Sequence, residues 1–154
     1  MQRDHRKWLW WLAVGLWIAV VLGFSSDQFS ADSTSRFLAP LLRWILPELS
    51  AETEQYLLFL VRKGAHVFEY AVLAALAYQA RRESSDPWRS AGLALALVAA
   101  VAVADETHQA ASAARTGSAI DVSIDVAGGA AALLLLVGIR RLHQVRQLRR
   151  EAAG

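Results

Sequence analysis

Cysteine is absent from the 154-residue sequence, and proline, methionine and charged residues are scarce. Without cysteine the chain can form neither a disulfide bond nor a thiol nucleophile, so a disulfide-stapled domain and a cysteine enzyme are both excluded. Charged residues make up only 19% of the chain, whereas soluble domains have roughly 25%. Hydrophobic residues make up 55% and are gathered in long blocks. This pattern excludes a disordered chain and predicts a membrane protein.

Basic and acidic residues nearly balance, with 16 Lys and Arg against 14 Asp and Glu. The arginines are concentrated at the ends of the apolar blocks instead of forming a broad basic surface, so no nucleic-acid partner is expected. The length is that of a single domain, residues 1–154.

Four apolar segments are predicted to cross the membrane as helices, at residues 8–24, 55–80, 90–109 and 120–139. The first could also be a secretory signal peptide, but its tryptophan-rich start and the lack of an A-x-A cleavage site favour a retained helix. A span needs about 20 residues, so the other three segments reach across only by including their polar ends. Those ends must be shielded from lipid, which predicts an all-α, integral membrane four-helix bundle.

The distribution of basic residues predicts the orientation of this bundle. Eleven of the 16 Lys and Arg lie before the first segment, between the second and third, or after the fourth. Because cytoplasmic loops are enriched in basic residues, both termini are expected in the cytoplasm, with the multi-pass bundle in a bacterial inner membrane. Residues 140–154 are a basic cytoplasmic tail that is expected to meet anionic headgroups.

Residues 33–47 are too apolar for a plain loop. Large apolar residues such as Phe37 and Trp44 alternate there with basic ones such as Arg43. This pattern predicts an additional amphipathic helix after the first span, which lies in the outer interface or re-enters the bundle. Ser50 is predicted to cap the start of the next helix.

Polar residues of all four predicted segments lie at one depth in the membrane. Counted from the cytoplasmic ends of the segments, they lie about 18–28 Å deep, in the outer part of the bilayer. They are Ser25, Lys63, His66, Glu69, Asp105, His108, Asp121 and Asp125. Lys63, His66 and Tyr70 share one helix face, and Asp121, Asp125 and Gly128 share another. A polar pocket open to the outer face is therefore predicted, with Gly128 allowing close packing beneath it.

Carboxylates outnumber cations in this predicted pocket. The acidic residues are Glu69, Asp105, Glu106, Asp121 and Asp125, against the basic residues Lys63 and Arg115. So many carboxylates require bound protons, a divalent metal ion or a cationic group of a ligand. A structural alternative is a set of buried ion pairs, such as Lys63 with Glu69, with His66 and His108 neutral. Glu106 is expected to point to solvent beside Asp105.

The same residues resemble a known family. The segments FSSDQ (24–28), RKGAHVFEY (62–70) and DETHQ (105–109), followed by Arg115, Ser118, Asp121, Asp125 and Gly128, are similar to the VanZ-like family of small bacterial membrane proteins. The resemblance covers about residues 20–130. Relatives often have Pro-Gly before the arginine, where this chain has Ala113 and Ala114. The resemblance implies an integral membrane protein of the cell envelope with an outer polar site, and one relative is associated with teicoplanin resistance.

Two functions are expected from these observations. One is recognition or modification of an amphiphilic envelope molecule or membrane lipid, with a contribution to glycopeptide or lipoglycopeptide tolerance. The alternative is a metal- or His-dependent phosphatase or transferase that acts on lipid-linked phosphate. Its candidate catalytic residues are His66, His108, Asp105 and Asp121. The candidate substrate-binding residues are Lys63, Glu69, Gln109, Arg115, Ser118 and Asp125.

Overall fold

The computed structural model describes residues 2–24, 31–82, 84, 86–110 and 118–152, and it describes only the backbone of residues 2–6 and 31–34. Within these ranges the chain is helical and contains no strand. The helices are α1 (Gln2–Phe24), α2 (Ala31–Ile45), α3 (Ala51–Ala80), α4 (Pro87–Ala110) and α5 (Ala119–Glu151). The prediction of an all-α bundle with an additional helix after the first span is therefore confirmed.

Three helices are long and apolar enough to cross a membrane. The apolar stretches lie in Lys7–Phe24, Pro87–Ala110 and Ala119–Glu151, which include the first, third and fourth predicted spans. Helix α3 has 30 residues, which gives it a length of about 45 Å, but charged side chains such as Arg62 and Lys63 lower its hydropathy. The crossing by α3, the orientation of the termini and the type of membrane therefore stay predictions.

Helix α3 is nevertheless at the centre of the bundle, because it packs against α1, α2, α4 and α5. Tyr70, Leu73, Ala74 and Ala77 in its second half are buried almost completely. The long helix whose apolar stretch is interrupted by charged residues in its middle is thus the one that packs against all the others. This arrangement provides the shielding from lipid that its charged residues need.

Two adjacent glycines of α5 allow the helices to approach closely. A Cβ atom on Gly128 would lie 3.0 Å from the carbonyl oxygen of Val67 in α3, and one on Gly129 would lie 2.9 Å from Cγ1 of Val98 in α4. Both distances are shorter than an ordinary van der Waals contact, so a larger residue would push the helices apart. The close packing predicted at Gly128 is confirmed.

Side-chain caps mark the starts of two helices. The hydroxyl of Ser50 accepts a hydrogen bond from the backbone N–H of Thr53 at 3.2 Å, which confirms the cap predicted for α3. The carboxylate of Asp86 accepts from the N–H groups of Trp88 and Arg89 at 2.9 and 3.2 Å. These bonds begin α4 immediately after the preceding turn.

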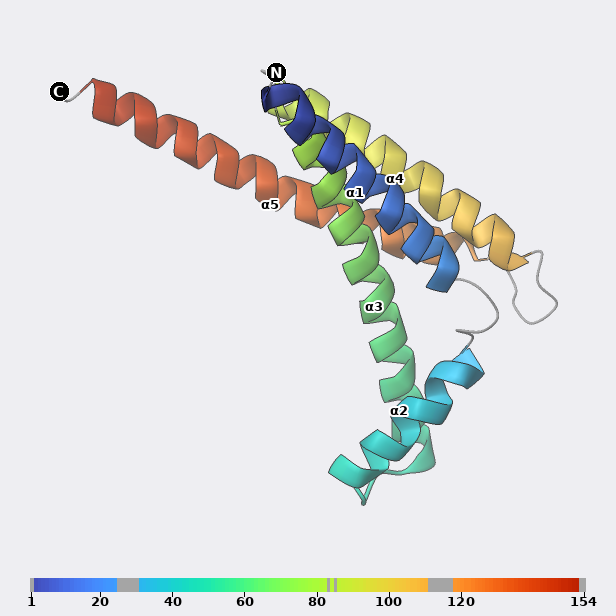
Figure 1. Ribbon diagram of the computed structural model, residues 1–154. Helices are drawn as coiled ribbons and strands as arrows, with labels where there is room; N and C mark the ends of the chain where they lie inside the picture. The colour runs from blue at the N-terminus through green and yellow to red at the C-terminus, as the bar shows by residue number, and fades with distance from the viewer. Residues whose placement is uncertain (1, 25–30, 83, 85, 111–117, 153–154) are drawn as a thin grey trace.

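Two parts of the molecule extend away from the bundle (Figure 1). The last turns of α5 leave it at the end that also contains the N-terminus. At the other end, α2 and the first turns of α3 project together. A bidentate ion pair joins α2 to α3 there. Arg43 Nε lies 2.7 Å from Glu54 Oε2, and Arg43 Nη2 lies 3.0 Å from Glu54 Oε1. The predicted helix at residues 33–47 is thus present as α2, and its place in the membrane interface stays a prediction.

Candidate functional site

One face of α3 carries three polar side chains, each of which contacts a carboxylate of a neighbouring helix. Lys63 contacts Asp121 of α5, His66 lies near Asp125 of α5, and Tyr70 contacts Asp105 of α4. Residue numbers rise together along α3 and α5 in these pairs, so the two helices run in the same direction. We call these six side chains and Gln109 the polar cluster.

The first contact in the polar cluster is partly open to solvent. Lys63 Nζ donates a hydrogen bond to Asp121 Oδ1 at 2.5 Å, and the two side chains are 18% and 36% exposed. Lys63 Nζ also lies 5.5 Å from the ring centroid of Phe59, within the range of a cation–π interaction. The Lys63 ammonium is therefore held by an anion and an aromatic face at the rim of the cluster.

The second contact is looser. His66 Nδ1 lies 3.9 Å from Asp125 Oδ1, which is too long for a hydrogen bond but close enough for an electrostatic interaction. The side chain of Asp125 is buried, and the charges of Asp105, Asp121 and Glu106 all act on it. Several carboxylates thus converge around Asp125 in a region of little solvent.

Asp105 forms the deepest part of the polar cluster and is only 2% exposed. Its Oδ2 accepts hydrogen bonds from the Tyr70 hydroxyl at 3.2 Å and from Gln109 Nε2 at 3.0 Å. Its Oδ1 is buried and has no hydrogen-bond partner among the residues that the structure describes. Burying a carboxylate oxygen without a hydrogen-bond donor costs free energy. A further donor placed next to Asp105 Oδ1 would remove this cost.

Glu69 connects the polar cluster to α1. Its side chain is partly buried on α3 and its charge interacts with that of Asp105. Its backbone oxygen accepts a hydrogen bond from Trp17 Nε1 of α1 at 2.9 Å. The ion pair of Lys63 with Glu69 that the structural alternative predicted is not the one observed, because Lys63 reaches across to Asp121 instead.

Glu106 lies at the junction of α4 and α5. The prediction that it points to solvent is wrong, since the side chain is buried and accepts a hydrogen bond from the backbone N–H of Ser118. This bond ties the end of α4 to the start of α5. Sequence reasoning missed this bond because its donor, Ser118, lies on another segment, and the approach of that segment to α4 depends on tertiary packing.

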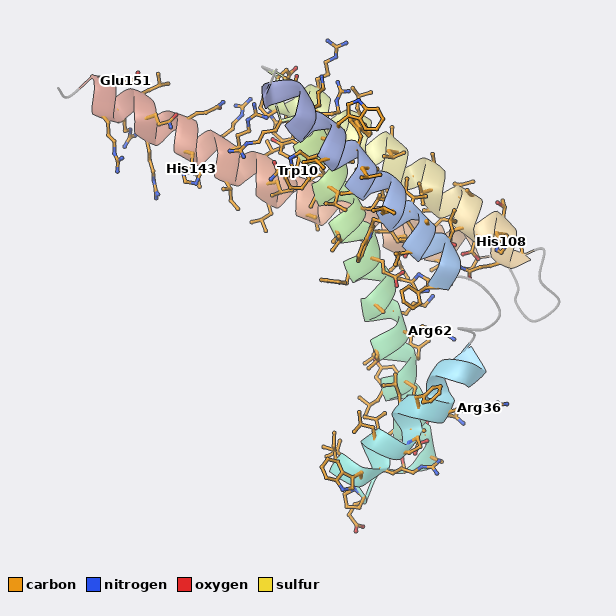
Figure 2. The ribbon with its side chains drawn as sticks, in the orientation of Figure 1. Trp10, Arg36, Arg62, His108, His143 and Glu151 are labelled. Atoms are coloured by element: carbon orange, nitrogen blue, oxygen red, sulfur yellow. The ribbon has the colours of Figure 1, made fainter. Side chains whose placement is uncertain are left out.

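The remaining predicted residues lie outside these contacts or outside the described residues. His108 is exposed near the end of α4 (Figure 2), and no contact of its side chain with the polar cluster is present among the described residues. Ser118 takes part through its backbone N–H only. Arg115 and Ser25 lie outside the described ranges. The structure thus brings together Lys63, His66, Asp105, Gln109, Asp121 and Asp125, and the roles proposed for them stay predictions.

Two contributors to the site were not predicted. Tyr70 was not among the candidate site residues, but it is fully buried and its hydroxyl donates a hydrogen bond to Asp105. Its position on the same face as Lys63 and His66 was the available signal. The hydrogen bond from Trp17 of α1 could not be predicted, because Trp17 is one of several tryptophans in an apolar segment.

The donor atoms of the polar cluster are arranged for ion pairs and hydrogen bonds. In the described part of the chain, no three His, Asp or Glu side chains lie close enough together to hold a metal ion. The polar cluster contains three carboxylates, Asp105, Asp121 and Asp125, against one lysine among the described residues, and the carboxylates of Glu69 and Glu106 act on it from nearby. The described site therefore carries an excess of negative charge when its acids are ionised.

Comparison with known proteins identifies the family. A family model described as VanZ/LLP1 matches residues 10–141, which include most of the chain. The chain belongs to the VanZ/LLP1 family. No curated protein and no solved structure matches it. The VanZ/LLP1 match contains every residue of the polar cluster, so the predicted resemblance is confirmed over the region that builds the site.

Proposed function

We propose that this VanZ/LLP1 protein binds an amphiphilic molecule of the cell envelope through an amine-bearing headgroup held by the polar cluster. The observation that carries the proposal is the buried Oδ1 of Asp105, which has no hydrogen-bond partner among the described residues and lies at the base of a cluster rich in carboxylates. A primary ammonium group supplies up to three hydrogen-bond donors together with a positive charge. It would therefore donate a hydrogen bond to Asp105 Oδ1 and would also offset the excess negative charge of the polar cluster.

The charged residues near the α3–α4 turn support an orientation that exposes the cluster to the outer leaflet. Arg140 Nη2 donates to the backbone oxygen of Ser84 at 2.8 Å, and the Arg141 guanidinium lies 5.8 Å from the ring of Trp88. Basic residues thus gather at the end of the bundle opposite Lys63 and Asp121. By the positive-inside bias this end is cytoplasmic, so the ligand would enter from the outer leaflet of the inner membrane.

Helix α2 supplies apolar surface for the rest of such a ligand. Phe37 and Trp44 are more than four-fifths exposed, and Arg43 holds the helix against α3. Exposed aromatic side chains beside basic residues are typical of helices that lie in the membrane interface. We propose that α2 rests on the outer leaflet and contacts the acyl part of the ligand.

Binding of an envelope amphiphile would link the protein to glycopeptide or lipoglycopeptide tolerance. Such antibiotics act at the outer face of the membrane, where the polar cluster would be exposed. Deletion of the gene and complementation with an Asp105→Asn variant test this consequence. We expect the variant to express normally and to leave susceptibility at the level of the deletion strain.

Direct binding is the sharper test of the proposed function. Purified protein in nanodiscs would be titrated with phosphatidylethanolamine and with its N-acetylated form, which lacks the positive charge. We expect the wild type to prefer the free amine and the Asp105→Asn variant to bind it at least tenfold more weakly, because a hydrogen bond to a charged group contributes about 1.5–3 kcal/mol. Asp86→Asn is the matched control, since asparagine keeps the α4 cap outside the cluster. Equal affinity for the two lipids, or no effect of Asp105→Asn, would contradict the proposal.

The His66–Asp125 pair favours a second candidate function. A histidine beside a buried carboxylate can act as a general acid or nucleophile, and Lys63 could neutralise a phosphate. This pair supports the phosphatase or transferase that acts on lipid-linked phosphate. Release of phosphate from a polyprenyl diphosphate by purified protein, lost in His66→Ala, would favour the enzyme. Amine-dependent binding without turnover would favour the binder.

A further inference from the structure

A groove lies on the surface of α1, away from the polar cluster. It has a volume of about 850 Å³ and is lined by Lys7, Trp8, Trp11, Leu12, Gly15 and Leu16. These residues recur at helical spacing and form one stripe, while Val14 and Val21 on the other side of α1 are buried in the bundle. The groove therefore faces out of the bundle, where a lipid or another protein would contact it.

The shape of the groove follows from its side chains. Trp8 is 76% exposed and projects beside Trp11, whereas Gly15 has no atom within 4 Å of the place where a Cβ would stand. Two large aromatic side chains thus stand above a hollow at the glycine. The distance from Lys7 to Leu16 along the helix is about 14 Å, which is roughly half the thickness of the hydrocarbon core, or the acyl layer of one leaflet.

The charge of the groove points to one kind of occupant. Among the side chains that the structure describes, Lys7 is the charged residue at one end of the groove, and the rest of the lining is apolar. A molecule that matches this pattern has a negative group at the level of Lys7 and a hydrocarbon chain that extends past the tryptophans. Anionic phospholipids have this form, and basic residues beside a membrane span attract their phosphates.

A second copy of the chain fits less well. Two copies that packed in parallel through this face would bring their Lys7 side chains together, and like charges repel. Gly15 and Ala19 form one pair of small residues a turn apart, as close helix contacts in membranes require, but Trp11, one turn before Gly15, lines the groove. The bulky tryptophan on the groove side opposes a close helix pair.

We propose that this groove of α1 binds one anionic phospholipid, with the phosphate against Lys7 and an acyl chain between Trp8, Trp11 and Gly15. The lipid belongs to the leaflet that contains the start of α1. This site is separate from the polar cluster and does not depend on the function proposed for it.

Native mass spectrometry of the full chain from mixed phosphatidylglycerol and phosphatidylcholine micelles tests this site. We expect the wild type to retain one phosphatidylglycerol in preference to phosphatidylcholine. Lys7→Gln should lower that preference about fivefold, because it removes one basic residue near the lipid phosphate. Gly15→Leu should remove the retained lipid, since its side chain fills the hollow.

Gly138→Leu is the control for the glycine variant, because Gly138 of α5 is equally open. It should retain lipid as the wild type does. Equal retention in Gly15→Leu and wild type, or equal retention of the two lipids by the wild type, would overturn the proposal. A change of Gly15→Leu from dimer to monomer without loss of lipid would assign the groove to a second copy and would also overturn it.

Discussion

Helix α3 takes part in two sets of ion pairs that differ in composition and surroundings. Near the start of α3, Glu54 forms an ion pair with Arg43, whose guanidinium donates a hydrogen bond to each carboxylate oxygen. Further along, Lys63, His66 and Tyr70 meet a group of carboxylates that one lysine does not balance among the described residues. The first set is complete in itself and fixes α2 to α3. The second leaves a buried acceptor without a donor, so attachment of helices does not account for it.

This comparison shows where a ligand would act. An ion pair with equal numbers of charges is explained by its contribution to the fold. An excess of buried carboxylates needs bound protons or a further positive charge, and a ligand can supply the positive charge. The variants below change one set and leave the other intact, in order of decreasing effect on stability.

The largest effect is expected from Gly129→Leu, which should disrupt the contacts of the polar cluster. It should leave the ion pair of Arg43 with Glu54, here called the outer pair, intact. Its side chain would collide with Val98 and force α4 and α5 apart. We expect a loss of about 3 kcal/mol in the free energy of unfolding, at the upper end of measured costs of overpacking. Unfolding in mixed SDS micelles measures it. Gly138→Leu, in open space on the same helix, should change stability by less than about 0.5 kcal/mol. Similar losses in the two variants would show that the close approach at Gly129 is unimportant.

An intermediate effect is expected from a double-mutant cycle on Lys63→Met and Asp121→Asn. Lys63→Met leaves Asp121 without its cation, whereas the double variant removes both charges. We expect a coupling free energy of about 1 kcal/mol, because the pair is partly exposed. The corresponding cycle on Arg43 and Glu54 should give a smaller value, since Arg43 is mostly exposed. A larger coupling free energy for Arg43 and Glu54 than for Lys63 and Asp121 would contradict this prediction.

The smallest effect concerns the pH dependence of the outer pair. Hydrogen bonds from Arg43 lower the pKa of Glu54 below its usual range. A lowered pKa in the folded state means that the pair stabilises the protein above the unfolded pKa of about 4.3. This stabilisation is lost as the pH falls through the folded value.

Wild type should therefore be slightly more stable than Glu54→Gln at pH 6, and the difference should vanish near pH 3. Thermal unfolding of both proteins across this range measures the difference. A gap that stays constant with pH would show that the Glu54 charge does not contribute, and a gap that widens in acid would reverse the expected sign.

Much of the architecture was predictable because it depends on local patterns. The apolar blocks, the amphipathic segment after the first span and the cap at Ser50 each follow from neighbouring residues, and all three are present as helical features. The site was predictable in part for the same reason. Lys63 and His66 share a face of one helix, Asp121 and Asp125 share a face of another, and each pair has a fixed spacing.

The wrong expectations all concern which partner a side chain selects. Lys63 was expected to pair with Glu69 in one alternative, and Glu106 was expected to point to solvent. Both outcomes depend on how closely the helices approach and on their rotation, which Gly128 and Gly129 control through contacts with other helices. Residue spacing within one segment contains no information about such contacts.

By itself the sequence determined that the chain is helical and that it suits a membrane, and it predicted that the ionisable residues lie at similar depths. Periodicity and hydropathy are properties of single segments, so they can be read along the chain. Only the tertiary structure decided that Lys63 meets Asp121, that Glu106 binds the start of α5, and that one oxygen of Asp105 is buried with no donor among the described residues. These facts arise where three helices meet, and the packing of their side chains is a property of the whole bundle.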